Sequence, residues 1–141
     1  MKNLPTLAIA AVVLFTAAWA CNMSTANISS FKTSKDREGK QESTSFKGGE
    51  TIYGRAAISN NMGKVKIKLK ITVDDVSGMD KGDMVKGSDV TIDMDGDGTG
   101  IYSLAVPVGV KSGKYILTAD MLNEAGETKD TKSVNLNVSD E

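Results

Sequence analysis

The residues with the clearest capacity for chemistry form one acidic stretch, Asp93-Met94-Asp95-Gly96-Asp97-Gly98-Thr99. Three carboxylates at alternate positions, then a glycine and a residue that can offer its backbone carbonyl, supply the hard oxygen ligands that Ca²⁺ prefers. The glycine permits the sharp turn that such a loop needs. The stretch therefore predicts one possible cofactor, Ca²⁺, with Asp93, Asp95, Asp97 and Thr99 as candidate ligands.

Two features of the same stretch favour an ordinary turn instead. Leu104 occupies the twelfth position, where an EF-hand calcium loop carries its bidentate glutamate. Asp and Gly are also the usual residues of tight turns between strands, because they tolerate left-handed backbone and form local hydrogen bonds. Both interpretations, a calcium site and a turn, remain open at this stage.

A second candidate surface is a row of lysines, Lys64, Lys66, Lys68 and Lys70, that alternates with apolar residues. Alternate residues of a strand share one face of the sheet, so the four charges would form a positive patch. Such a patch could bind an anionic partner, for example lipid headgroups or an acidic protein. The alternative is a solvated sheet face whose lysines oppose edge-to-edge aggregation.

The composition argues against catalysis. The chain has no histidine and a single cysteine, Cys21, so it lacks the usual ligands of zinc, copper and haem and the commonest general base. A carboxylate-based hydrolase is the distant alternative, but few aromatic residues are present to build a sugar cleft. A formal net charge of −1 gives no electrostatic case for nucleic acid. We expect a protein that is not an enzyme.

The first twenty residues predict a secretory signal peptide, residues 1–20. Lys2 supplies the positive n-region, an apolar run extends from Leu4 to Trp19, and Ala18-Trp19-Ala20 has the form of a cleavage site. The run is shorter than the roughly 20 residues that a membrane-spanning helix needs. The chain is therefore expected to be exported.

Cys21 follows the predicted cleavage site directly and resembles the lipid-modified residue of bacterial lipoproteins. That resemblance implies a membrane anchor at Cys21, and Asn22 resembles the outer-membrane sorting pattern. Ala18 and Trp19 depart from the lipoprotein signal, which usually has Leu three residues before the cysteine and a small residue two before it. The alternative is ordinary cleavage that leaves a free thiol. The expected location is the cell envelope, as an outer membrane lipoprotein or in the periplasm.

The elements that would position these residues are strands. After a polar tether over residues 21–30, residues 31–141 form one domain in which short apolar-alternating runs are separated by Gly, Asp and Asn. Strands are expected over residues 51–59, 64–73, 90–95, 102–108, 115–121 and 134–138, with a weaker one over 28–33. About seven strands with frequent turn signals predict an all-β, antiparallel β-sandwich.

The stretch GDGTGIYSLAVPVGVKSGKYILTADMLNEAGETKD, residues 96–130, resembles the second half of bacterial immunoglobulin-like domains, and Phe46 to Thr51 resembles the approach to their second strand. The resemblance implies an immunoglobulin-like β-sandwich with Tyr115 at its tyrosine corner, the ring in the core and the hydroxyl bonded to backbone. That architecture hosts adhesion, spacing, binding and inhibition alike. We therefore expect a non-catalytic binding or structural module with an envelope protein as partner, or alternatively a calcium-stabilised adhesion or spacer module.

Overall fold

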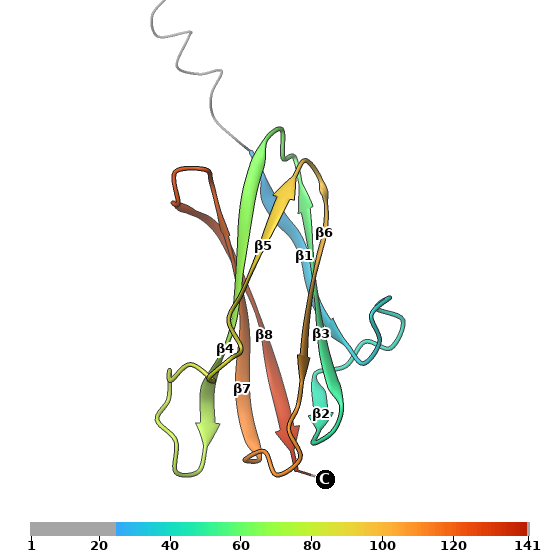
Figure 1. Ribbon diagram of the computed structural model, residues 1–141, viewed down its shortest axis with the longest axis vertical. Coiled ribbons are helices and arrows are strands. Elements are labelled where there is room, and N and C mark those ends of the chain that lie inside the picture. The colour runs from blue at the N-terminus through green and yellow to red at the C-terminus, as the bar shows by residue number, and fades with distance from the viewer. Residues whose placement is uncertain (1–24, 141) are drawn as a thin grey trace, which may run out of the picture.

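The computed structural model describes residues 25–140, and within this range every regular element is a strand (Figure 1). The strands are β1 (Asn27–Ser34), β2 (Ser45–Lys47), β3 (Thr51–Ser59), β4 (Lys64–Val76), β5 (Val90–Asp95), β6 (Gly98–Ala105), β7 (Gly113–Leu122) and β8 (Thr128–Ser139). They form a three-stranded sheet in the order β1-β3-β6 and a five-stranded sheet in the order β2-β8-β7-β4-β5. The prediction of an all-β sandwich is confirmed.

Alternation of apolar and polar residues produces the two layers. In β4 the apolar residues Val65 to Val73 are buried at every second position, whereas Lys64, Lys66, Lys68 and Lys70 are exposed on the other face. β3 has the same period, with Ile52, Ala56 and Ile58 buried. Burying one face of each sheet against the other removes apolar surface from water, which is the main force that holds the layers together.

The strand boundaries differ from the sequence prediction in several places; among them, β4 ends at Val76 and β8 already begins at Thr128. β1 (Asn27–Ser34) confirms the weaker strand predicted over 28–33, and residues 27–30, which were also assigned to the tether, pair with β3. β2 is an additional strand of three residues that runs parallel to β8, and its length is too short for a periodic signal. β6 covers residues 98–105 rather than 102–108, and Pro107, which has no N–H to donate, follows two residues later.

Tyr115 forms the predicted tyrosine corner. Its side chain is buried, and its hydroxyl donates a hydrogen bond of 2.7 Å to the carbonyl of Lys111, four residues upstream. Burial raises the pKa of the Tyr115 hydroxyl. The bond fixes the loop that leads into β7 against the core, as the resemblance to immunoglobulin-like domains implied.

A second buried tyrosine, Tyr102 of β6, connects the two sheets. Its side chain is 1% exposed, and its hydroxyl donates to the carbonyl of Ser88 at 2.7 Å. The Ser88 hydroxyl in turn accepts from the N–H of Ile71 in β4 at 3.0 Å. Burial, with a smaller contribution from the charge of Asp89, raises the pKa of Tyr102 to about 12. This chain of hydrogen bonds holds the loop before β5 against both sheets.

The long loop between β4 and β5 packs along the edge of β4. The N–H of Val85 donates to the carbonyl of Ile71 at 2.8 Å, and the N–H of Val73 donates to the carbonyl of Asp83 at 2.9 Å. Lys81 forms an ion pair of 2.9 Å with Asp74. The loop therefore extends the sheet beyond the start of β5.

The part of the chain that the structure describes has no helix long and apolar enough to cross a membrane.

Candidate functional site

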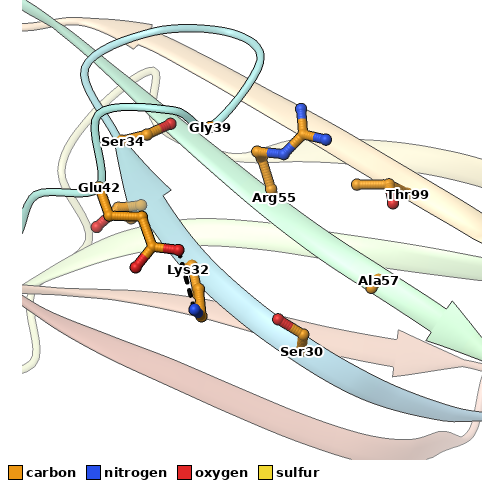
Figure 2. A pocket seen from close by; sticks show the side chains of 9 residues that line it. Ser30, Lys32, Ser34, Gly39, Glu42, Arg55, Ala57 and Thr99 are labelled. Carbon is orange, nitrogen blue, oxygen red and sulfur yellow. Dashed lines mark hydrogen bonds and ion pairs between the residues drawn. The ribbon is translucent and has the colours of Figure 1, made fainter.

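A hollow of about 220 Å³ lies on the outer face of the three-stranded sheet, beneath the loop that joins β1 to β2 (Figure 2). We call this loop, residues 35–44, the β1–β2 loop. The residues that line the hollow come from β1, β3, β6 and this loop: Ser30, Lys32, Thr33, Ser34, Gly39, Glu42, Arg55, Ala57 and Thr99.

Strand register explains why the sheet is hollow at this point. Ser30 of β1 lies opposite Ala57 of β3, and Ala57 lies opposite Thr99 of β6, so three small side chains form the floor. The next row pairs Lys32 with Arg55, whose long side chains form one flank. Small residues beside long charged ones leave a recess that water or a ligand can enter.

The β1–β2 loop forms the opposite wall and is itself ordered by hydrogen bonds. The Asp36 carboxylate accepts from the N–H of Gln41 at 2.6 Å and from the N–H of Lys40 at 3.0 Å, and these bonds hold its pKa below the ordinary value. Gly39 adopts a positive φ of 78°, a conformation that glycine takes without steric cost. A Cβ atom at Gly39 would lie 2.8 Å from Cδ of Arg55, so the loop rests directly on that side chain.

The two cations of the hollow differ in their partners. Lys32 forms an ion pair of 2.9 Å with Glu42, drawn as the dashed line in Figure 2. Arg55 donates one N–H to the carbonyl of Arg37 at 2.5 Å, and no carboxylate within residues 25–140 forms an ion pair with it. A guanidinium has five N–H donors in a planar fork that matches a carboxylate or phosphate. Arg55 therefore has donors left for an anionic ligand.

The predicted calcium ligands are separated by the structure. Asp93 and Asp95 lie on β5 opposite Lys66 and Lys64, and Asp93 is 3.6 Å from the Lys66 ammonium group. Asp97 lies in the turn to β6, where its carboxylate accepts the N–H of Asn61 at 2.7 Å. Within residues 25–140, no group of three acidic or thiol side chains is arranged to hold a metal ion. Thr99 belongs to the hollow instead.

The predicted lysine patch lies on the outer face of the five-stranded sheet, and neighbouring strands supply opposite charges. Asp95 lies opposite Lys64, Asp93 opposite Lys66, and Asp120 of β7 opposite Lys68, while Lys70 faces Thr118. Lys64 and Lys66 also line a shallow depression of about 510 Å³ together with Asp93, Asp95 and Glu124. The row is therefore part of a mixed-charge surface.

Neither Arg55 nor the β1–β2 loop was predicted from the sequence as part of a site. Alternation along residues 51–59 places Arg55 outward, but nothing in the pattern indicates that a loop ten or more residues upstream folds back over it. The predicted signal peptide, residues 1–20, and the predicted lipidation at Cys21 lie outside the described residues.

Comparison with solved structures identifies the fold. An immunoglobulin-like protein from Pseudomonas aeruginosa superposes with a TM-score of 0.50 at 15% identity, covering 83% of this chain and 98% of that protein. The C-terminal domain of wzt superposes with a TM-score of 0.51 at 16% identity, covering 82% of this chain and 74% of that one. The domain is therefore an immunoglobulin-like β-sandwich.

A third structure, a family 76 glycoside hydrolase from a bovine Bacteroides thetaiotaomicron strain, overlaps with 70% of this chain at a TM-score of 0.44 and 18% identity. The chain spans only 20% of that hydrolase, so the overlap carries no argument about activity. No protein-family model and no curated protein matches the chain.

Proposed function

We propose that this protein is a non-catalytic binding module of the bacterial cell envelope, anchored to a membrane through Cys21. In this proposal it recognises an acidic group of an envelope protein in the hollow beneath the β1–β2 loop. The observation that supports the ligand class is Arg55, whose guanidinium is held in place by the Arg37 carbonyl but has no carboxylate partner among residues 25–140. Charge-assisted, bidentate hydrogen bonds make such a group a strong binding site for a carboxylate.

The acidic residues support the non-catalytic part of the proposal. A carboxyl group that acts as a general acid near neutral pH needs a raised pKa. Each described carboxyl group whose pKa departs clearly from its ordinary value has it lowered: Asp36 by backbone N–H groups, Glu50 by Lys35, and Glu127 by Lys129. These carboxylates are suited to structural hydrogen bonds and ion pairs.

The proposed anchor fits the position of the hollow. β1 begins at Asn27, and a fully extended segment over residues 22–26 spans roughly 20 Å. An anchor at Cys21 would thus keep the end of the sandwich that carries the β3–β4 turn close to the membrane. β1 runs away from that end and leads into the β1–β2 loop (Figure 1). In this proposal the hollow beneath that loop would therefore stay accessible.

Site-specific photo-crosslinking in bacteria that express the full chain tests the proposal. A photoreactive residue at Ser30, which lines the hollow, is expected to yield an adduct with an envelope protein. The same residue at Ser133, on the outer face of the five-stranded sheet, should yield none. Arg55→Gln should lower the Ser30 adduct by about ten-fold or more, the loss expected for a charge-assisted hydrogen bond.

The anchor is tested in the same cells by fractionation and intact mass, with Cys21→Ala as the control. An acylated chain beginning at residue 21 in the membrane fraction supports it, and an unmodified soluble chain contradicts it.

Equal adducts from Ser30 and Ser133, or an Arg55→Gln chain that cross-links like the parent, would contradict the proposed site.

A further inference from the structure

The sheets have several open edges, and all but one of those within residues 25–140 carry a device that discourages pairing with another chain. β1 contains Lys32 and a register shift after Ile28, and the β1–β2 loop pairs with its second half. β2 has only three residues, and the part of β8 beyond it carries Lys129, Asp130 and Lys132. β5 carries Asp93 and Asp95. Charges, bulges, short length and covering loops are the usual means by which proteins protect sheet edges.

β6 has none of these devices. Its eight residues, GTGIYSLA, include no charged residue and no proline, and it pairs with β3 without a register shift. β6 is the last strand of its sheet (Figure 1). The preceding strand, β5, belongs to the other sheet, where it pairs with β4. Thr99, Ser103 and Ala105 are exposed on its outer face. This is an unprotected edge of the kind that accepts an added strand.

The backbone groups of this edge point toward solvent. Val106 donates its N–H to the carbonyl of Glu50 at 2.8 Å, and hydrogen-bonded pairs alternate along antiparallel strands. From the register, Leu104, Tyr102 and Gly100 therefore bond to β3. The N–H and C=O groups of the alternate residues face away from β3, and no loop or side chain within residues 25–140 forms a hydrogen bond to them. These residues are Thr99, Ile101, Ser103 and Ala105.

We propose that β6 pairs antiparallel with β6 of a second copy of this chain, so that two three-stranded sheets join into one continuous sheet. The β6 edge is compatible with pairing to a second copy of itself, because it carries no charged residue and the two strands would not repel each other. The nearest charged residue in that row, Arg55, lies one strand back on β3. A two-fold axis would place Thr99 opposite Ala105 and Ile101 opposite Ser103, all of them uncharged.

The size of this contact sets its strength. Pairing of one edge strand buries less than the roughly 1,200 Å² of a stable interface, so the dimer is weak in dilute solution. Confinement of anchored copies to one membrane surface would raise their effective concentration, a contribution that rests on the proposed function. The pairing itself does not depend on the hollow.

Photo-crosslinking of the full chain, expressed as two copies with different tags, tests the inference. A photoreactive residue at Ala105 is expected to give a covalent adduct that contains both tags, and the same residue at Thr118 on the central strand β7 should give none. Ser103→Lys places two like charges at diagonal positions on the same face of the paired strands and should lower the adduct about five-fold. Ser103→Ala, which adds no charge at the same position, should leave it unchanged.

The outcomes separate this inference from the proposed function. An Ala105 adduct with a different protein, no adduct, or an adduct insensitive to Ser103→Lys overturns the pairing, provided that thermal melting confirms that the variant is folded. Arg55→Gln should leave the Ala105 adduct intact while it lowers the Ser30 adduct. Failure of one result with success of the other therefore identifies which of the two proposals is wrong.

Discussion

The outer faces of the two sheets carry charge in opposite ways. On the five-stranded sheet, the conspicuous lysines of β4 lie opposite Asp95, Asp93 and Asp120 of the strands on either side. On the three-stranded sheet, Lys32 pairs with Glu42, whereas Arg55 has no ion-pair partner among the described residues and lies beneath the β1–β2 loop. The lysines of the five-stranded face are thus largely compensated by neighbouring strands, whereas Arg55 on the three-stranded face is not.

The charge of one strand therefore predicts little about a protein surface until the neighbouring strands are known. Cross-strand neighbours are set by register, and register pairs residues that are far apart in the sequence. Variants on each face would show whether the two faces differ in this way and whether the two sheets unfold as one cooperative unit.

The largest expected effect on stability concerns Tyr102, which connects the two sheets through hydrogen bonds at Ser88. Its folded-state pKa of about 12 lies above its ordinary value of 10.0, so the folded protein retains the proton as pH rises between these values. The contribution of this pKa difference to the free energy of unfolding is fully present below pH 10. It falls by up to roughly 2 kcal/mol as pH approaches 12. Tyr102→Phe should remove much of this decline, as measured by urea midpoints at several pH values.

Tyr53→Phe is the control for Tyr102, because Tyr53 lies half-buried on the outer face of β3. Two separate unfolding transitions at high pH would mean that the two sheets unfold independently. The two faces would then belong to two cooperative units instead of one.

A smaller effect is expected at Gly39, where the β1–β2 loop rests on Arg55. Alanine at a positive φ costs about 1–2 kcal/mol of stability, which urea unfolding would measure. The added Cβ would also displace the Arg55 side chain and lower the Ser30 adduct. Gly126→Ala is a matched control, because Gly126 has a similar φ of 82° but a Cβ added there would meet no atom within 4 Å. If both variants leave cross-linking unchanged, the loop does not position Arg55.

The smallest effect is expected on the five-stranded face. Lys66 and Asp93 are 3.6 Å apart and largely exposed, so Lys66→Gln should change the free energy of unfolding by less than about 0.5 kcal/mol. Urea unfolding at low and high salt checks this. A loss above about 1 kcal/mol would indicate that the lysine row contributes to the fold and is more than a solvated surface.

Much of the fold follows from local pattern, whereas the candidate site does not. Strict alternation predicted β4, and Tyr115 was placed correctly, because burial on one face of a strand is visible in a single segment. β2 was missed because three residues form a strand only through pairing with β8. Arg55 gained significance only from contacts with Arg37 and Gly39, which depend on how the β1–β2 loop folds.

The opposite placement of the first and last strand ends has a mechanical consequence. β1 starts at one end of the sandwich, whereas β8 finishes at the other, beside the loop where Asp140 accepts the N–H of Gly109 (Figure 1). A force that pulls these two points apart acts along the strands, and inter-strand hydrogen bonds lie perpendicular to antiparallel strands. The β1–β3 and β7–β8 ladders are then loaded in shear, with many bonds sharing the load at once instead of opening one after another. Such shear loading should make the sandwich more resistant to tension along its length than to tension across its strands.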